Sequence, residues 1–387
     1  MTAPTFHGFA RAHGAAGVRN HLLVLSIAGL TGPAARRVAQ ALPGARLVTM
    51  PFGGGLIGAD QALHMRTLAG LGLNANVGAV LLIGSDLPKI GTLGQTIRAS
   101  GKPVESVCLD DCGHDILTLS DRAIRAGARL LRDLSRQRRI ATPLADLFIG
   151  LECGRSDPSS GMVANPLIGK LTDMLIAQGG SAVFGETLEW LGAEHLLAQR
   201  AATPAIGDAL VQAVLRREQL AASQGVDLLG NNPGPTNIAA GLSTIEEKSL
   251  GAIAKSGSAP ISGVLPYGER PSVPGLYAMD APAYSPESLT GFVAAGTQLL
   301  LFSTGVGNSY VSALAPTVKL SANPVATQTL REQLDFDASA VFLGTQSIDA
   351  AAQELLAVLI DVASGTRTWG EVLGEGDEAV SRLGEAL

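Results

Sequence analysis

The chain alternates short apolar runs with segments in which apolar residues recur every three or four positions. The clearest runs are NHLLVLSIAGL (20–30), VGAVLLIGSDLP (77–88), ADLFIGLECG (145–154) and TQLLLFSTG (297–305). Runs of this kind, ending in Gly or polar residues, are typical of strands buried on both faces of a parallel sheet. The amphipathic segments between them predict helices. We therefore expect an α/β fold made of two doubly wound, mostly parallel-sheet, Rossmann-like domains.

The length of 387 residues fits two domains. A long amphipathic helix, SDRAIRAGARLLRDLSRQRR (120–139), is expected to close the first, so that the domains span residues 1–140 and 141–387. Residues 230–290 are rich in Pro, Gly, Asn and Ser, which predicts an irregular functional segment with one helical core at 243–257. AVFLG (340–344) reads as a late strand, and a helix is expected to end the chain.

Composition and charge narrow the function classes. A formal net charge of −6 argues against a nucleic-acid-binding protein, and the basic run at 132–139 reads as a solvated helix face. No apolar run reaches the roughly 18 residues of a membrane span. Three cysteines give no disulfide framework, and the N-terminus lacks the apolar core of a signal peptide. These features predict a cytoplasmic protein with no membrane or nucleic-acid partner.

The stretch LECGRSDPSSGMVANPLIGK (151–170) concentrates polar chemistry where a predicted strand ends. Open α/β sheets bind their ligands at the carboxyl ends of strands. Glu152, Cys153 and Asp157 offer carboxylates and a thiolate, which bind Fe(II), Mn(II) or Zn(II). A simpler alternative makes Asn165 and Pro166 the N-cap and first residue of a helix. That alternative leaves the acids and the thiol unexplained.

Further candidates follow later strands. Glu186 opens the helix after SAVFG, either as a functional residue or as an acid that complements the helix dipole. Ser243 and Glu246 fit a capping box. Lys248 is either solvent-exposed or a buried general base with a lowered pKa. Asp280 flanks a loop, and the Gly-rich FSTGVGNS (302–309) offers backbone N–H groups to an anion.

Two other motifs are weaker. Gly53, Gly55 and Gly58 match the G-x-G-x-x-G pattern, but the acid expected about 20 residues later is missing, so we expect no NAD cofactor. The hypothesis that the protein is a nucleotide-dependent oxidoreductase would be supported by this glycine loop alone. CLDDCGH (108–114) lacks a second ligand pair for structural zinc, and Cys108 reads as a strand core residue.

Several long blocks, in order along nearly the whole chain, resemble the altronate and galactarate dehydratase family, which includes (2R)-sulfolactate sulfo-lyase. The blocks are GFARAHGAAGVRN (8–20), LECGRSDPSSGMVANPLIG (151–169), ETLEWLGAEHLLAQRA (186–201), GPTNIAAGLSTIEEKSLGAIAKSG (234–257), GLYAMDAPAYSPESLTGFVAAGTQLLLFSTG (275–305) and APTVKLSANP (315–324). The resemblance implies a metal-assisted lyase, typically dependent on Fe(II), with Mn(II) or Mg(II) as alternatives. Its substrate would be a 2-hydroxy acid with a leaving group, water or sulfite, at C3, and its product a 2-oxo acid. Family enzymes carry a small SAF domain, fused or as a separate subunit, so the resemblance also implies a separate SAF-type small subunit and a homo-oligomer of the large subunit.

Some positions depart from the family pattern. Phe52 and Gly54 stand where a His and a Cys are expected, and Gly84-Ser85-Asp86 replaces a GCE sequence. Ile238 replaces a Lys, and Val306 an Arg. These departures favour a divergent member, and they motivate an alternative: a catalytically weak sugar-acid-binding homologue.

The resemblance and the strand-end positions together suggest roles for individual residues. A divalent ion that binds the substrate carboxylate and hydroxyl would stabilise the charge formed when the C2 proton leaves. The expected metal ligands are Glu152, Cys153, Asp157, Glu186 and Asp280. Lys248 or Glu247 is expected to carry the proton step, with Cys153 also catalytic. The expected substrate-binding residues are Ser156, Ser160, Asn165, Ser303 and Thr304.

Overall fold

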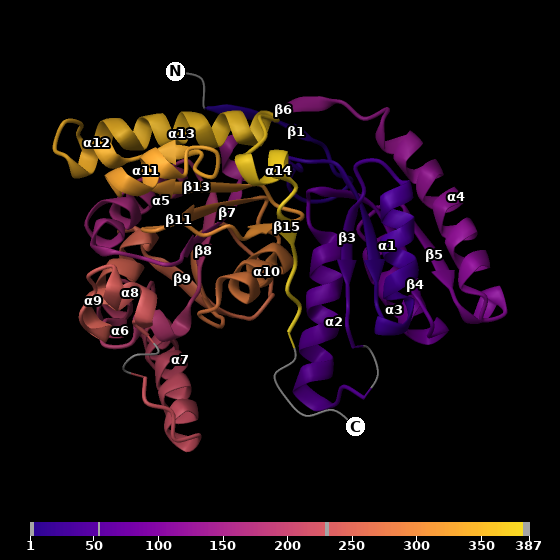
Figure 1. Cartoon of the computed structure of the whole chain (residues 1–387), viewed down its shortest axis with the longest axis horizontal. Coiled ribbons are helices and arrows are strands. Elements are labelled where there is room, and N and C mark those ends of the chain that lie inside the picture. The colour runs from indigo at the N-terminus through magenta and orange to yellow at the C-terminus, as the bar shows by residue number, and fades with distance from the viewer. Residues whose placement is uncertain (1–3, 53–54, 229–231, 382–387) are drawn as a thin grey trace.

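The structure is a computed structural model, and it describes residues 4–52, 55–228 and 232–381. It contains two lobes, each built on a parallel sheet with helices on both faces (Figure 1). The predicted α/β class with two doubly wound parallel sheets is confirmed. The division of the chain at residues 140 and 141 stays a prediction.

The smaller lobe is built on a four-stranded parallel sheet in the order β3-β2-β4-β5. Its strands are β2 (His21–Ser26), β3 (Arg46–Thr49), β4 (Val77–Gly84) and β5 (Val104–Cys108). Its helices are α1 (Gly32–Ala41), α2 (Gly58–Leu73), α3 (Leu87–Arg98) and α4 (Ile116–Leu134). All eight residues of β4 are buried, as expected for a central strand covered on both faces.

The larger lobe is built on a seven-stranded parallel sheet in the order β14-β13-β11-β7-β8-β10-β9. Its strands are β7 (Phe148–Cys153), β8 (Ser181–Phe184), β9 (Ile261–Pro266), β10 (Leu276–Asp280), β11 (Leu299–Ser303), β13 (Thr317–Ser321) and β14 (Phe336–Asp337). The chain first adds strands on the β8 side of β7 and then on its β11 side. A doubly wound sheet binds ligands at such a reversal.

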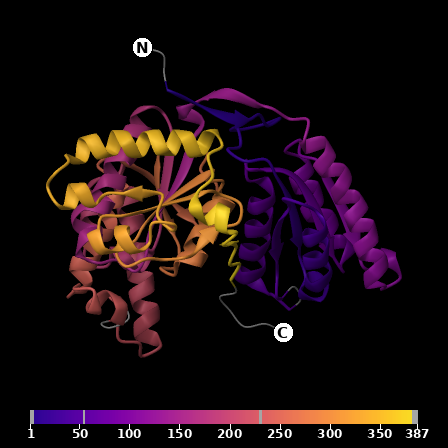
Figure 2. The same ribbon diagram turned by 45° about the horizontal axis from the view of Figure 1, so that its top comes forward.

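Ten α-helices are described in this part of the chain. They are α5 (Asn165–Ala177), α6 (Glu194–Gln199), α7 (Pro204–Ser223), α8 (Pro235–Ala239), α9 (Ile245–Ile253), α10 (Ser285–Ala295), α11 (Pro324–Thr329), α12 (Ser339–Phe342), α13 (Ile348–Ser364) and α14 (Trp369–Leu373). Figure 2 shows α13 lying across the large sheet, where Leu355 and Leu359 join the same apolar core as α5.

Two small sheets connect distant parts of the chain. Antiparallel β1 (Thr5–Phe9) and β6 (Arg139–Pro143) bring the N-terminal segment beside the link between the lobes. Parallel β12 (Val311–Ser312) and β15 (Gly376–Asp377) hold the C-terminal segment against the large lobe. This segment runs down between the two lobes in Figure 1.

The lobes share a hydrophobic core through α2 and α10. One cluster of buried residues includes Leu68 and Leu71 of α2, Val293 of α10 and strands of both sheets. Gly70 lets the helices meet, because a Cβ there would lie 2.2 Å from the carbonyl oxygen of Ala294. The close approach of the backbones requires glycine at this position.

The structure corrects four sequence expectations. The segment 230–290 contains strands β9 and β10 in addition to helix α9; β9 is an edge strand, where Gly263 and Pro266 are tolerated. AVFLG forms α12 and the following turn instead of a strand. Helix α9 is capped by Thr244, whose side chain accepts from the N–H of Glu247, so the cap lies one residue later than Ser243. The chain continues beyond α13 into α14 and β15.

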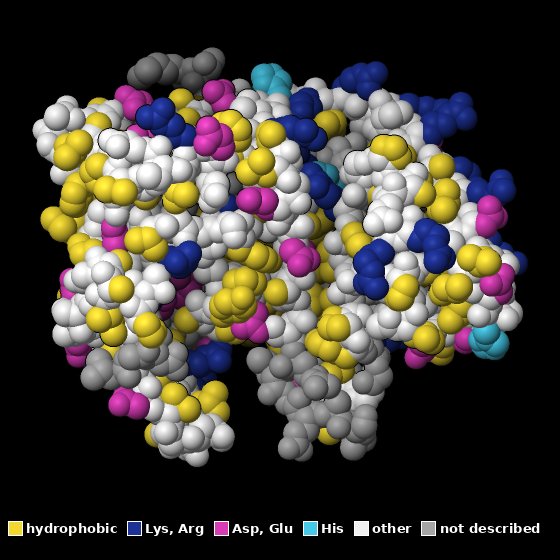
Figure 3. All heavy atoms as spheres, in the orientation of Figure 1, with side chains coloured by type: hydrophobic (Ala, Val, Ile, Leu, Met, Phe, Trp, Pro, Cys, Tyr) yellow, Lys and Arg dark blue, Asp and Glu magenta, His cyan; other side chains and the backbone are white. Residues whose placement is uncertain are grey.

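The expected exposure of the basic run and the expected burial of Cys108 are confirmed. Arg132, Arg136 and Arg138 are exposed, and Figure 3 shows Lys and Arg side chains gathered over α4. Cys108 is buried at the end of β5, and all three cysteines are free thiols. No helix in the described ranges is both long and apolar enough to cross a bilayer. Gly53 and Gly54 lie outside the described residues.

Candidate active site

Cys153 is the last residue of β7. At this strand the chain stops adding strands on one side of the sheet and begins on the other. It pairs in register with Ser303 of β11 on one side, and β8 lies on the other. Its side chain is 2% exposed. Successive strand residues point to opposite faces, so Glu152 points the other way and accepts a hydrogen bond from Ser288 Oγ of α10 at 2.8 Å.

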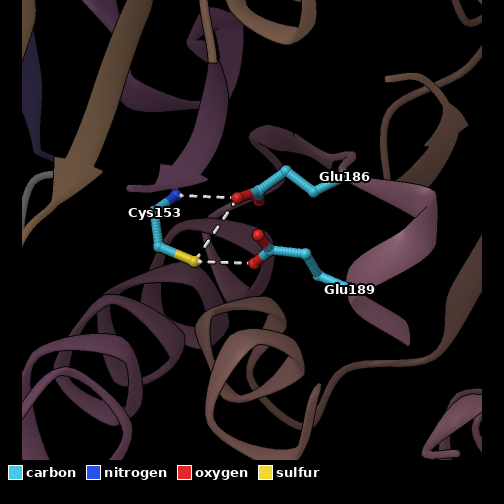
Figure 4. A group of neighbouring side chains, drawn as sticks. All are labelled: Cys153, Glu186 and Glu189. Atoms are coloured by element: carbon cyan, nitrogen blue, oxygen red, sulfur yellow. Dashed lines mark hydrogen bonds between the residues drawn. The ribbon is translucent and has the colours of Figure 1, made fainter. Parts of the chain in front are cut away.

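Two glutamates meet the thiol of Cys153 (Figure 4). Glu186 Oε1 lies 3.4 Å from Cys153 Sγ and accepts a 3.3 Å hydrogen bond from the Cys153 N–H. Glu189 Oε2 lies 3.6 Å from the same sulfur. Both glutamates come from the turn after β8, where a 3₁₀ helix spans Thr187–Trp190. Glu186 has a left-handed backbone with φ 64°, a strained conformation for a non-glycine residue of the kind that clusters at functional sites.

Two lysines complete the cluster from α9 and the turn that follows it. Lys248 pairs with Glu189, and Lys255 pairs with Glu186. Lys255 Nζ also lies 3.3 Å from Cys153 Sγ. The side chain of Lys255 is 1% exposed and that of Lys248 is 7% exposed. The charges therefore act on one another in a nearly dry environment, where they interact strongly.

Burial and neighbouring charges shift the pKa values in this cluster. Burial, followed by the charge of Glu186, raises the pKa values of Glu152 and Cys153 well above their usual range. Burial also raises the pKa of Glu186. For Lys248 and Lys255, burial acts in the opposite direction, but the surrounding acids outweigh it and raise both pKa values. The two lysines are thus ammonium ions, and they pair with Glu189 and Glu186.

The donor set fits a divalent metal. Ligand atoms of Cys153, Glu186 and Glu189 all lie within 4.8 Å of one another, and all three residues are buried. A divalent cation bound here would favour the ionised forms of the Cys153 thiol and the Glu186 carboxyl over the protonated forms that burial favours. Glu152 Oε1 has no hydrogen-bond partner among the described residues. A thiolate with carboxylates suits borderline ions such as Fe(II), Mn(II) or Zn(II).

A cleft of about 890 Å³ opens onto this cluster. Its walls include Cys153, Glu189 and Lys248 together with Arg155 and Asn308, while Lys255 lies behind them. Such a volume accommodates a small organic acid with its hydration water.

Comparison with known proteins assigns the chain to a family. Residues 144–386 match the model of the D-galactarate/altronate dehydratase C-terminal region, and residues 8–137 match the second domain of D-galactarate dehydratase/altronate hydrolase. The chain belongs to the altronate and galactarate dehydratase family. The resemblance noted in the sequence is thereby confirmed.

Three relatives indicate the kind of activity. The chain is 37% identical to (2R)-sulfolactate sulfo-lyase subunit beta of Chromohalobacter salexigens, over 99% of this chain and 98% of that protein. It is 32% identical to altronate dehydratase of Escherichia coli, over 94% of this chain and 74% of that protein. It is also 32% identical to galactarate dehydratase (L-threo-forming) of Escherichia coli, over 78% and 59% of the two chains. The relatives are lyases and dehydratases, and the protein is accordingly a lyase of this family.

Among the expected metal ligands, the structure brings Cys153 and Glu186 together and places Glu152 on the opposite face of β7.

Asp157 and Asp280 lie outside the group. Asp157 accepts hydrogen bonds from Ser159 Oγ at 2.7 Å and from Asn323 Nδ2 at 2.7 Å. Asp280 is held by the guanidinium groups of Arg216 and Arg217. Both carboxylates are thus occupied by structural partners.

The expected substrate-binding residues line a neighbouring region. The side chain of Asn165 donates to the carbonyl of Gly251 at 2.9 Å and accepts from Ser303 Oγ. It therefore ties β11 to α9, and it is not the N-cap of α5, which is Ala164. Thr304 Oγ1 accepts from the Gly307 N–H at 3.0 Å.

Ser156, Asp157 and Asn165 line a smaller pocket of about 280 Å³ that also reaches Lys248. Ser160 is buried and donates to the Asp157 carboxylate at 3.1 Å. The segment between β7 and α5 is thus a bonded turn beside the cluster, and Cys153 reaches into the cluster from the end of β7.

Glu247 has a different environment from Lys248. Its exposed carboxylate accepts hydrogen bonds from the N–H and hydroxyl of Ser243 at 2.8 and 2.6 Å. These bonds lower its pKa. This geometry ties Glu247 to the start of α9.

Glu189 and Lys255 belong to the cluster but were not among the expected residues. A periodic signal for both exists in the sequence. Glu189 is three residues after Glu186, and side chains at this spacing eclipse on a 3₁₀ helix. Lys255 is seven residues after Lys248, about two helical turns along the same face.

Proposed function

We propose that the chain is the large subunit of a metal-dependent lyase. It would eliminate a group from C3 of a 2-hydroxy acid and release a 2-oxo acid. The observation that carries this proposal is the buried group of Cys153, Glu186 and Glu189, whose ligand atoms all lie within 4.8 Å of one another. Fe(II) is the preferred ion and Mn(II) the alternative, because the group joins a thiol to two carboxylates. Mg(II), the other ion that the resemblance implies, fits this group less well because it prefers oxygen ligands.

The metal would be held by Cys153, Glu186 and Glu189, with Glu152 contributing charge from the other side of β7. When bound, the ion would supply Lewis-acid stabilisation of the charge that forms as the C2 proton is lost. Asp157 and Asp280 are left out of this proposal because Asn323 and the two arginines occupy them.

Lys248 is the residue we assign to the proton step. Its Nζ reaches the wall of the cleft, whereas Lys255 lies behind the cluster. The expected lowering of the Lys248 pKa is wrong, because the neighbouring acids raise it and keep the amine protonated. A divalent ion bound to those acids would offset their charge, and Lys248 as the free amine would then accept the C2 proton. Glu247, the other candidate, is exposed and its carboxylate is bonded to Ser243.

Residues next to the cluster would bind the rest of the substrate. Asn165, Ser303 and Thr304 lie near the carboxyl ends of β7 and β11, where hydroxyl, amide and backbone N–H groups can orient a carboxylate. Ser156 and Ser160 would act indirectly, by holding the turn that carries Cys153.

We further propose a separate SAF-type small subunit and a homo-oligomer of the large subunit. The relative whose length this chain nearly matches is named subunit beta, which implies at least one other subunit in that enzyme.

The test is an anaerobic assay with Fe(II) or Mn(II) and the small subunit, in which 2-oxo acid release is measured for sulfolactate, aldonates and aldarates. The proposal expects product only when metal is present. A chain that binds metal and releases no product from any of these acids would instead be a catalytically weak sugar-acid-binding homologue.

A further inference from the structure

Arg155 stands two residues after Cys153 in a backbone conformation that side chains rarely adopt. Its φ is 53°, in the left-handed region where glycine has no steric penalty and other residues do. The described non-glycine residues with positive φ are His114, Arg155 and Glu186. Glu186 belongs to the buried cluster, and Arg155 lines the cleft that opens onto it.

The hydrogen bonds of the turn explain the backbone conformation of Arg155, but they do not explain why an arginine side chain is present there. The Arg155 carbonyl accepts hydrogen bonds from the N–H groups of Gly305 and Val306, both at 3.3 Å, which joins the ends of β7 and β11. Glycine would make the same two bonds without strain. An arginine at this position is therefore explained only by what its side chain contacts.

The guanidinium of Arg155 has no partner within the described part of the chain. The residue is exposed and lines the cleft, and its side chain makes no hydrogen bond or ion pair with any described residue. Lys248, the other cation in the wall, is paired with Glu189. Two acids in the wall have local partners: Glu375 lies 3.5 Å from Lys319, and Asp377 accepts from the Glu378 N–H at 2.8 Å. Arg155 is thus available to an anionic ligand.

We propose that Arg155 binds a sulfonate on C3 of the substrate and so selects a C–S lyase reaction over a dehydration. This inference rests on the proposed function and adds the leaving group to it. Guanidinium N–H groups match paired oxygens of a tetrahedral anion better than a neutral hydroxyl. The relative with the matching length is a sulfo-lyase subunit, which agrees with this choice.

The reaction balances without an oxidant. A base takes the C2 proton, the C2–H electron pair forms the C2–C3 double bond, and the C3–S bond breaks. Sulfite leaves with the electron pair of the C3–S bond, and the enol tautomerises to the 2-oxo acid. The negative charge on the departing group grows as the bond breaks, so a cation beside it favours the transition state.

The test compares 3-sulfolactate with glycerate, which differ only in the C3 substituent and would both give pyruvate. We expect Arg155→Gly, with metal and small subunit present, to raise KM for sulfolactate about a hundredfold, as for loss of a strong charge-assisted contact. KM for glycerate should change less than about twofold. Arg155→Lys should fall between, because it keeps the charge but loses the paired geometry.

His114→Gly is the matched control, because His114 is exposed, has φ 62° and lies in the small lobe. It should leave both KM values unchanged. Equal effects of Arg155→Gly on both substrates, or a wild-type preference for glycerate, would overturn the assignment of Arg155. If no substrate yields product, the proposed function fails, and calorimetric binding of 3-sulfolactate to wild type and Arg155→Gly still decides the role of Arg155.

Discussion

The carboxyl edges of the small and large sheets invite comparison, because both sheets are parallel and doubly wound. At the edge of the small sheet, Ser26 bonds to Thr31 at 3.0 Å, and Cys108 packs into an apolar core. At the edge of the large sheet, Cys153 meets Glu186 and Lys255. The same strand-end position therefore supports either packing or chemistry, and buried charge distinguishes them.

The two lobes also differ in the charge state of their buried titratable groups. In the small lobe, His64 is 2% exposed and neither ring nitrogen has a hydrogen-bond partner in the described structure. Burial lowers its pKa to about 4, so it stays neutral. In the large lobe, burial is accompanied by opposing charges that keep Lys248 and Lys255 ionised. Similar burial therefore leaves a side chain neutral where it has no charged partner, and ionised where opposite charges surround it.

The largest expected effect separates the two cysteines. Cys153→Ala should reduce turnover by at least about a thousandfold, because a catalytic metal would lose a ligand. Cys108→Ala, also buried at a strand end, should keep turnover within about twofold, since large-to-small changes alone affect mainly stability. Steady-state kinetics at equal metal loading measures both. Equal losses of turnover in the two variants would contradict the view that only the edge of the large sheet is catalytic.

Removing a buried lysine should also affect the lobes unequally. Lys255→Met leaves the acids Glu186 and Cys153 without their cation, which we expect to cost about 3–5 kcal/mol in free energy of unfolding. Lys102 in the small lobe donates instead to the carbonyls of Gly72 and Asn74. Lys102→Met should cost about 1–3 kcal/mol. Urea unfolding of the metal-free chain at pH 8 provides both values, and the reverse order would refute this view.

The pH dependence of stability should have opposite signs at two buried groups. The pKa of His64 is lowered from 6.5 to about 4, so its contribution is present above pH 6.5 and is lost as pH falls toward 4. Burial raises the pKa of Glu378 from 4.5 to about 7, so its contribution is present below pH 4.5 and is lost as pH rises through 7. His64→Leu should therefore flatten the acid side of the stability profile.

Glu378→Gln should flatten the neutral side of the same profile. Denaturant titrations between pH 4 and 8 compare each variant with the wild type. A variant profile parallel to that of the wild type would show that the substituted group does not titrate as described.

The smallest effects concern the start of α9. Thr244→Ala removes the side-chain cap and should cost about 1 kcal/mol. Glu247→Gln should keep kcat within about twofold, because Glu247 bonds to Ser243 rather than to the cluster. Lys248 is the exception in this segment, because Lys248→Met should abolish the proton step. A large loss of kcat in Glu247→Gln, with stability unchanged, would return the proton step to Glu247.

Local patterns in the sequence predicted much of the fold and part of the cluster. Apolar runs located β4, β7 and β11, and the strand-end position pointed to Cys153 and Glu186. Glu189 and Lys255 were missed because their partners are distant in sequence: Lys255 meets Cys153 across 102 positions. Strand β9 was missed because its edge position permits Gly263 and Pro266, which normally interrupt a strand. Strand β10 was missed because its five residues lie between Gly- and Pro-rich segments.

Asn165 shows a further limit of local patterns. Its place before a proline suggested a helix cap, but tertiary contacts with Ser303 and Gly251 use its side chain instead. Asp157 and Asp280 were expected at the metal for their position alone, and only the fold shows that Asn323, Arg216 and Arg217 bind them.

The central claim is that Cys153, Glu186 and Glu189 bind a divalent ion. The most direct test is anaerobic titration of the chain with Co(II), followed by electronic absorption, because a thiolate ligand gives a sulfur-to-metal charge-transfer band. We expect one equivalent to bind with such a band in the wild type and in Cys108→Ala, and the band to vanish in Cys153→Ala. A band that persists in Cys153→Ala, or wild-type protein that binds no Co(II), would contradict the account.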